Sequence, residues 1–193
     1  MFKKILALFC AALLTASLAG CISFADTSSE TSSAADTSEK NQSFTVESIN
    51  LRFTVPSDWT EDNSDTELDW YCENNSVGMG IFGYFKSDYA DGTDITELLK
   101  QQTRSNLSDY SNTTPVEHKA EFSSSDKSIT YELYSAEYNG VKLYQYFCYV
   151  DFKDSDEFYW VTFSSLPSYM KRNFDMLEKI IDSFEIVNGG DEL

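Results

Sequence analysis

Side chains capable of acid–base or nucleophilic chemistry are scarce in this sequence. It contains a single histidine, His118, in 193 residues. A Ser-His-Asp or Cys-His site would have to use that residue, and the sequence has no Gly-x-Ser-x-Gly motif to present a nucleophile. His118 falls on the apolar side of an alternating stretch, and a general base also needs a partner within hydrogen-bond reach. We therefore expect His118 to be a packing residue, and we assign no catalytic residue.

The sequence has no residues with the spacing of known metal-binding or cofactor-binding motifs. No cysteines and histidines are spaced as zinc ligands, and no glycine-rich phosphate loop occurs. The stretch Asp88–Asp94 is similar to a calcium-binding loop, whose sixth position is a glycine. If Gly92 takes that position, Tyr89 falls at the third position and Leu98 at the twelfth, so the pattern of calcium ligands fails. We expect a loop that ends in a helix cap at Asp94, and we predict no metal ligand and no cofactor. Weak cation binding is the alternative to solvated turns in two other acidic loops: Glu61, Asp62, Asp65, Glu67 and Asp69, and Asp151, Asp154, Asp156 and Glu157.

The first twenty residues have the order of a secretion signal. Two lysines precede an apolar core over residues 5–16, which is too short to span a bilayer. The segment ends in Leu18-Ala19-Gly20-Cys21, which resembles the lipobox of bacterial lipoproteins. The resemblance implies that residues 1–20 are a signal peptide, and that Cys21 receives a diacylglycerol and becomes the N-terminus. The alternative is an ordinary secretory signal with an Ala-x-Ala-like cleavage site and an incidental cysteine.

A polar segment follows the cysteine. Residues 21–42 are rich in serine, threonine and acidic residues and have too few large apolar side chains to offset the entropy of folding. We expect lipidated Cys21 to continue into a disordered tether with a root-mean-square span of roughly 25 Å. A diacylglycerol has the two acyl chains that stable anchoring needs. The predicted localisation is therefore the outer face of a bacterial cell membrane, and the first partner is membrane lipid, bound through the Cys21 anchor.

The net charge of −18 restricts the other partners. An acidic domain is repelled by nucleic acid and by anionic headgroups, so we predict no nucleic-acid partner. The charge favours a basic protein surface or divalent cations. The competing explanation is that the charge only keeps a surface protein soluble.

Two further cysteines, Cys72 and Cys148, lie in aromatic, strand-like runs. Outside the cytoplasm a disulfide is permitted. A domain of this size does not need one, however, and bridging requires Cα atoms within about 7 Å. We expect two buried thiols, with a disulfide as the alternative.

Periodicity predicts one domain over residues 43–187 and a flexible tail over residues 188–193. Two helices are expected, one over 94–109 and one from 167 or 168 to 184. The first would face inward with Ile95, Leu98, Leu99, Gln102 and Leu107. Strands are expected over 43–47, 51–55, 67–72, 77–86, 116–123, 128–138, 141–152 and 157–165, with a tight turn at Asn139-Gly140.

The polarity of these strands indicates how they are covered. Residues 141–152 and 157–165 are apolar on both faces, as in strands that are buried on both sides. Residues 116–123 alternate instead, as one-sided burial would give. We therefore predict an α+β fold, an antiparallel β-sheet flanked by helices on both faces.

Two short motifs then suggest a family. Phe53-Thr54-Val55-Pro56-Ser57-Asp58-Trp59 near the start and Ile180-Ile181-Asp182-Ser183-Phe184-Glu185-Ile186 near the end, with the antiparallel strands between them, resemble the PsbP-like α/β/α sandwich. That fold is shared by the extrinsic PsbP subunit of photosystem II, a Ran-binding nuclear import factor and DcrB-like bacterial lipoproteins. The resemblance covers about residues 43–187 and implies a non-catalytic accessory or binding protein. None of the family's partner-contact residues can be matched here.

We predict a membrane-anchored extracytoplasmic lipoprotein that acts as a non-catalytic binding or accessory module. The alternative is a lipoprotein that binds a cell-wall polymer or glycan through exposed aromatic side chains, and a third reading is an enzyme of unknown class. The glycan-binding hypothesis requires exposed tyrosine rings, whereas we expect the tyrosines of these strands to pack in the core. They are Tyr131, Tyr134, Tyr138, Tyr144, Tyr146, Tyr149 and Tyr159.

Overall fold

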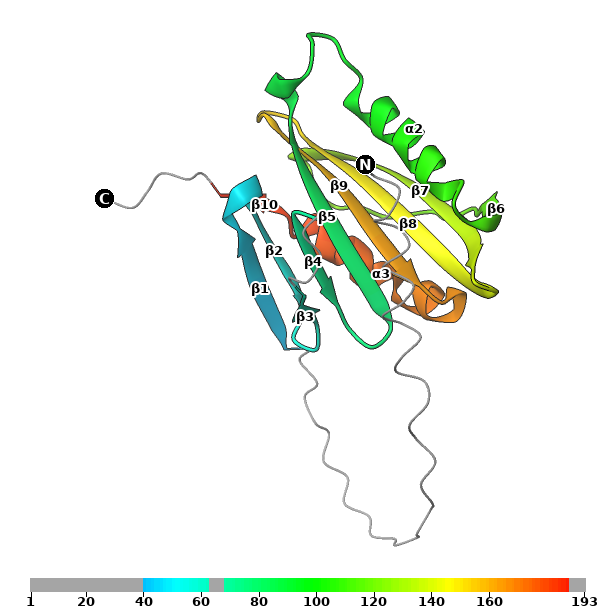
Figure 1. The fold of residues 1–193 in the computed structure, drawn as a ribbon. Coiled ribbons are helices and arrows are strands. Elements are labelled where there is room, and N and C mark those ends of the chain that lie inside the picture. The colour runs from blue at the N-terminus through cyan, green and yellow to red at the C-terminus, as the bar shows by residue number, and fades with distance from the viewer. Residues whose placement is uncertain (1–39, 63–67, 188–193) are drawn as a thin grey trace, which may run out of the picture.

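The computed structural model describes residues 40–62 and 68–187. A seven-stranded antiparallel sheet has the order β3-β4-β5-β9-β8-β7-β6, and a three-stranded antiparallel sheet has the order β1-β2-β10 (Figure 1). The strands are β1 (Asn41–Val46), β2 (Leu51–Pro56), β3 (Thr60–Glu61), β4 (Trp70–Glu73), β5 (Val77–Phe85), β6 (Ser111–Pro115), β7 (Lys127–Tyr138), β8 (Val141–Phe152), β9 (Glu157–Ser165) and β10 (Glu185–Ile186). The helices are α2 (Ile95–Leu107) and α3 (Pro167–Asp182), with the short 3-10 turns η2 (Glu47–Ile49) and η3 (Lys86–Asp88).

Several predictions concern residues outside those that the structure describes. The signal peptide over residues 1–20, Cys21, the tether as far as residue 39 and the tail over 188–193 lie outside the described residues and stay predictions. The last two residues assigned to the tether, Asn41 and Gln42, belong instead to β1, where they pair with the end of β2.

The two helices lie on opposite sides of the large sheet (Figure 1). Ile95, Leu99 and Leu107 of α2 pack with Phe147 and Trp160 on one face. Residues of α3 and of the three-stranded sheet pack together on the other face. The predicted antiparallel sheet with helices on both faces is therefore confirmed, and the small sheet is an addition to it. In the described part of the chain, no helix is both long and apolar enough to cross a bilayer.

The central strands are buried as their sequence predicts. Along β8, Phe147 and Tyr149 contribute to the α2 side of the core, whereas Tyr146 and Cys148 contribute to the α3 side. All four side chains are at most 1% exposed. The turn that joins β7 to β8 is also confirmed, because Asn139 and Gly140 have φ values of 49° and 79°, as a tight turn of primed type requires.

The small sheet docks on the large one through a close approach at Gly83 of β5. A Cβ atom at Gly83 would lie 2.5 Å from Cγ2 of Ile49 in η2. The Tyr159 hydroxyl of β9 donates a hydrogen bond of 2.7 Å to the Ile49 carbonyl. Glycine is therefore needed at 83 so that η2 can lie directly against the sheet.

Helix α2 begins as predicted, but its inner face differs from the prediction at Leu98 and Thr103. The Asp94 side chain accepts a 3.0 Å hydrogen bond from the backbone N–H of Glu97, which confirms the cap. Leu98 was wrongly placed on the inner face, since it is 43% exposed. Thr103 takes part in the inner stripe instead, because its hydroxyl is 2.8 Å from that of Tyr149 and is thereby satisfied.

Two further boundaries differ from prediction. Helix α3 ends at Asp182, and Phe184 lies buried in the chain that leads to β10. Residues 116–123 were predicted as a strand, which is wrong: strand β6 ends at Pro115, and the chain is irregular until β7 begins at Lys127.

Candidate functional site

The only histidine of the sequence packs against α3. His118 Nε2 lies 2.7 Å from Glu178 Oε1, and the imidazole stacks on the Phe174 ring with the centroids 3.8 Å apart. The expectation of a packing residue is confirmed, although His118 is not on a strand. Among the described residues no hydrogen bond joins His118 to a serine, threonine or cysteine side chain.

His118 belongs to the segment 116–126, here called the strap, which connects β6 to β7. Strand β6 pairs with β7 at Thr114–Ser135 and Pro115–Tyr134. The last bond runs from Val116 N–H to the Leu133 carbonyl, at 2.8 Å. Beyond Val116 the strap leaves the edge of β7 and lies along α3.

Two carboxylates of α3, four residues apart, hold the strap. Besides bonding His118, Glu178 accepts a 2.9 Å hydrogen bond from the Glu121 N–H. Asp182 accepts bonds from the N–H and the hydroxyl of Ser123, at 2.8 and 2.7 Å, and from the hydroxyl of Ser124, at 2.8 Å. Partial burial acts to raise the pKa of Asp182, but the hydrogen bonds from Ser123 and Ser124 outweigh it and hold that pKa below its ordinary value.

Charge explains why the strap does not pair with β7. Continuing the β6–β7 register beyond Val116 would place Glu117 directly opposite Glu132, and like charges in that arrangement are destabilising. On α3, by contrast, the N–H groups of Glu121 and Ser123 find charged acceptors, which form the stronger class of hydrogen bond.

The departure of the strap leaves part of β7 open. In an antiparallel strand the N–H and C=O of one residue point to the same side, and the side alternates along the chain. The Leu133 carbonyl points outward to Val116, so the main-chain groups of Tyr131 and Ile129 also point outward. No strand in the described part of the chain pairs with residues 128–132 on this side.

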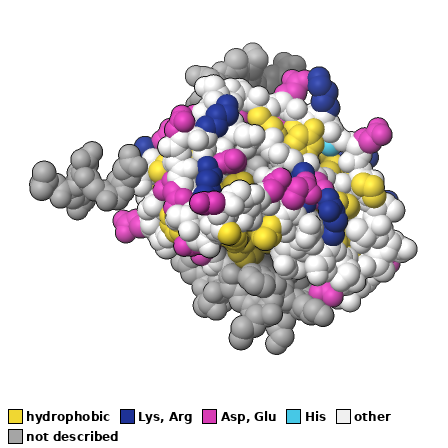
Figure 2. Space-filling view, turned by 90° about the horizontal axis from the view of Figure 1, so that it is seen from above, with side chains coloured by type: hydrophobic (Ala, Val, Ile, Leu, Met, Phe, Trp, Pro, Cys, Tyr) yellow, Lys and Arg dark blue, Asp and Glu magenta, His cyan; other side chains and the backbone are white. Residues whose placement is uncertain are grey.

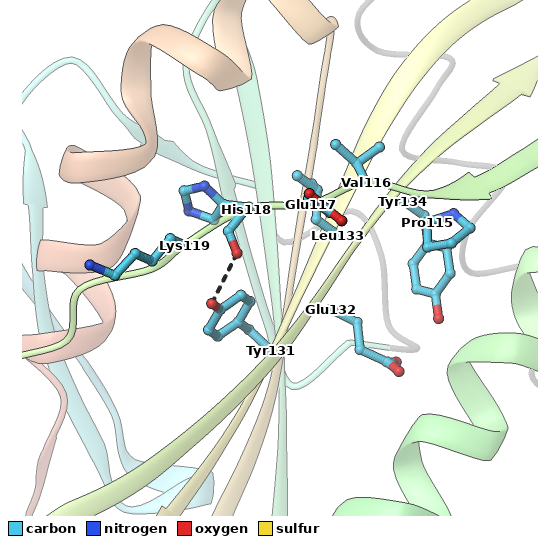
Figure 3. Close-up of a pocket in the computed structure, with 9 residues that line it drawn as sticks. All are labelled: Pro115, Val116, Glu117, His118, Lys119, Tyr131, Glu132, Leu133 and Tyr134. Carbon is cyan, nitrogen blue, oxygen red and sulfur yellow. Dashed lines mark hydrogen bonds between the residues drawn. The ribbon is translucent and has the colours of Figure 1, made fainter.

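A shallow hollow of about 560 Å³, here called the notch, lies where the strap and β7 diverge (Figure 3). It is lined by Pro115, Val116, Glu117, His118 and Lys119 of the β6–strap side and by Tyr131, Glu132, Leu133 and Tyr134 of β7. The Tyr131 hydroxyl donates a 3.1 Å bond to the His118 carbonyl and so closes one end. Glu132 points toward α2, where Arg104 lies 3.3 Å from it.

The acidic loops are occupied by structural contacts. Asp156 accepts bonds from the N–H and the hydroxyl of Ser87, and these bonds lower the pKa of its carboxyl. Glu61 accepts from the indole of Trp70, and Asp69 accepts from the Gly83 N–H. Asp65 and Glu67 lie outside the described residues. Within residues 40–62 and 68–187 no three potential ligands group as a metal site would require.

The tyrosines divide into two sets. Tyr144, Tyr146, Tyr149 and Tyr159 are buried, as the core-packing prediction requires, whereas Tyr131, Tyr134 and Tyr138 are partly buried. In the view from above, acidic and basic side chains are interspersed over the surface, and exposed apolar side chains form only small patches (Figure 2).

The two cysteines are free and buried. Cys72 is on β4 and Cys148 on β8, with β5 and β9 between them. Three strand spacings of about 4.8 Å separate their backbones by roughly 14 Å, twice the limit for a bridge. The prediction of two buried thiols is confirmed, and burial raises the pKa of both.

Glu178, Asp182 and the open edge of β7 were not predicted from the sequence. The available signal was the spacing of the two acidic residues, since positions i and i+4 share one helix face. Their role depends on a segment about sixty residues away, which no local pattern reveals.

No protein-family model and no curated protein sequence matches the chain. Several solved structures are similar to it, and three of them are described here. PsbP of the cyanobacterium Synechocystis sp. PCC 6803 aligns with a TM-score of 0.53 at 9% identity, over 81% of this chain and 98% of its own. The Ran-binding protein Mog1p of Saccharomyces cerevisiae gives 0.55 at 10% identity, over 78% and 97%. LpqN, involved in cell envelope biogenesis of Mycobacterium tuberculosis, gives 0.52 at 10% identity, over 77% and 91%. Identities this low show the fold alone: this chain has the PsbP-like α+β fold.

Proposed function

We propose that this protein is a membrane-anchored extracytoplasmic lipoprotein that works as a non-catalytic binding module, with the open edge of β7 and the notch as its binding face. The observation that carries the proposal is the departure of the strap, which leaves residues 128–132 without a neighbouring strand in the described chain. Open edges of this kind are templates for pairing with another chain, and proteins usually cover or blunt them.

Two other facts support a binding role over a catalytic one. His118 is engaged by Glu178 and Phe174 and thereby holds the strap. The notch is shallow and lies beside a sheet edge, which suits a polypeptide better than a small substrate, since substrate sites enclose most of their ligand. The similar structures include a protein described as Ran-binding and one described as involved in cell envelope biogenesis, which is consistent with an accessory role in the envelope.

The glycan-binding alternative receives less support. Stacking on sugars needs a row of exposed aromatic rings, but four of the seven tyrosines considered are buried and the other three are partly buried. Tyr131 also uses its hydroxyl to bind the His118 carbonyl.

Site-specific photo-crosslinking in the cells that produce the protein tests the proposal. A photo-reactive residue would replace Ser128, which is exposed on β7, or, as the matched control, Ser57, which is exposed beyond β2. We expect Ser128 to give one dominant protein adduct and Ser57 to give none. An adduct only from Ser57 would overturn the assignment of the binding face, and no adduct from either would contradict a binding module.

A further inference from the structure

The geometry points to a strand-addition site: we infer that residues 128–132 of β7 accept a basic, extended segment of a partner protein as an eighth strand beside the seven of the large sheet. The inference rests on the proposed function and names the chemistry of the partner. Main-chain pairing would supply affinity and side chains on alternating sides would supply specificity, as in other cases of strand addition.

The main chain offers a defined set of hydrogen-bonding groups. Ile129 and Tyr131 each direct one N–H and one C=O away from β8, because the Leu133 carbonyl has that direction and the direction repeats every second residue. Thr130, between them, turns its groups toward β8, in the register Thr130–Tyr149. An incoming segment therefore finds two donors and two acceptors at strand spacing.

The charges around this edge favour a basic segment. Glu117, Glu121 and Asp126 of the strap are exposed, and Glu132 lies on β7 itself. The nearby cations are largely committed: Lys119 pairs with Glu121, and Arg104 pairs with Glu132. Lys127 is buried, with its ammonium group bound to the carbonyls of Asp182 and Phe184. Lys127 also lies 3.7 Å from Asp126, so three of the four carboxylates are offset by a cation. Among the described residues Glu117 has no such partner, and together with the net charge of −18 on the chain it favours a basic segment.

The side chains of β7 predict a pattern for the partner. Ile129 and Tyr131 are partly buried on the α3 side, beside the strap residue Phe122, whose ring centroid is 6.0 Å from that of Tyr131. Ser128, Thr130 and Glu132 are directed to the α2 side by the alternation of the strand. The segment should therefore alternate, with apolar side chains next to Ile129 and Tyr131 and basic side chains next to Glu132.

Two other occupants of the edge are disfavoured on electrostatic grounds. A second copy would bring together two chains that each carry a net charge of −18. The strap itself would place Glu117 opposite Glu132 and would lose its bonds to Glu178 and Asp182.

The test uses the full chain in detergent and three end-blocked synthetic peptides. The first is Lys-Val-Lys-Val-Lys-Val-Lys, the second has proline in place of the central valine, and the third has glutamate in place of every lysine. We expect the first to bind measurably more tightly than both others, because proline cannot donate to a ladder and glutamate is repelled. Equal affinity for the first two peptides would overturn strand pairing.

Charge substitutions at the edge locate the binding. Relative to wild type, Ser128→Lys should lower the affinity for the first peptide about two- to fivefold, and Ser128→Glu should raise that affinity by a similar factor. This is the range for exposed charge pairs. Both variants change an exposed side chain, so the fold is retained. The matched control is the same pair at Ser57, which should leave the affinity unchanged.

These variants also distinguish this site from binding elsewhere, and a partner protein from a second copy of the chain. Equal binding by Ser128→Lys and Ser128→Glu would overturn this site, even if crosslinking shows that the protein binds partners elsewhere. Formation of dimers by the wild-type chain that Ser128→Lys abolishes would instead identify a second copy as the occupant and would contradict the proposal.

Discussion

His118 and Glu178, sixty residues apart in the chain, meet at 2.7 Å between Nε2 and Oε1. This contact decides where the strap lies. With Glu178 also bound to the Glu121 N–H, and Asp182 bound to Ser123 and Ser124, the strap is fixed to α3 rather than to β7. The open edge of β7 is therefore a consequence of contacts made on the other side of the strap.

Replacing Glu178 should loosen the strap. Glu178→Ala removes both acceptor oxygens at a site that is 6% exposed, so His118 and the Glu121 N–H lose this partner. We expect the free energy of unfolding to fall by about 1–3 kcal/mol, the range for a buried polar group left unsatisfied. Urea denaturation measures this fall. Asp175→Asn, an exposed change on the same helix, is the control and should shift it by less than about 0.5 kcal/mol. Equal effects of the two changes would show that Glu178 does not secure the strap.

Acid should weaken the strap through Asp182. Its pKa in the folded protein lies below the ordinary value, so the carboxylate stabilises the fold above the pKa of the unfolded chain. That stabilisation is lost as pH falls through the folded pKa. In Asp182→Asn the acid-dependent part of the unfolding free energy should be smaller than in wild type, as urea denaturation between about pH 2 and 6 would measure. An unchanged pH dependence in the variant would count against this assignment.

A methyl group at position 83 should disturb the docking of the small sheet. Gly83→Ala places Cβ 2.5 Å from Cγ2 of Ile49, so η2 must shift. We expect a loss of about 1–3 kcal/mol, the usual cost of overpacking. Ile49→Gly removes both Cγ2 and the Ile49 Cβ, which would lie 2.6 Å from the new atom. Combining it with Gly83→Ala should therefore cost less than the sum of the two single effects, because no clashing side-chain atom is left. Thermal unfolding of the four proteins provides the comparison, and strict additivity would contradict the proposed clash.

Anchoring depends on Cys21, which lies outside the described residues. Cys21→Ser removes the thiol that would receive the diacylglycerol, so the protein should no longer incorporate a labelled fatty-acid analogue fed to the cells. The matched control, Cys72→Ser, changes a buried core thiol and should retain the label. Continued labelling of Cys21→Ser would show that the lipobox interpretation is wrong.

The fold was predictable where burial alone decides it. Strands β8 and β9 are apolar on both faces and proved to be covered by α2 on one side and by α3 on the other. The turn at Asn139-Gly140 is set by local backbone preference, and it too was predicted correctly.

The strap shows the limit of such patterns. Val116, His118, Ala120 and Phe122 alternate with exposed residues, and the structure confirms this alternation in burial. The same pattern wrongly predicted a strand, because one-sided burial can be achieved against a helix as well as within a sheet. Whether the strap packs on α3 or pairs with β7 depends on Glu132, Glu178 and Asp182, which are distant from most of it in sequence. Strand β10, only two residues long, is equally a product of the tertiary arrangement.

Hydrogen exchange of the β7 amides in the unliganded full chain tests the open edge most directly. We predict fast exchange at Ile129 and Tyr131, whose N–H groups face outward, and slow exchange at Thr130 and Glu132, whose N–H groups face β8. Protection differing at least about tenfold between the two pairs would support the open edge. Uniform slow exchange over residues 129–132 would contradict it, because it would mean that the edge is already paired.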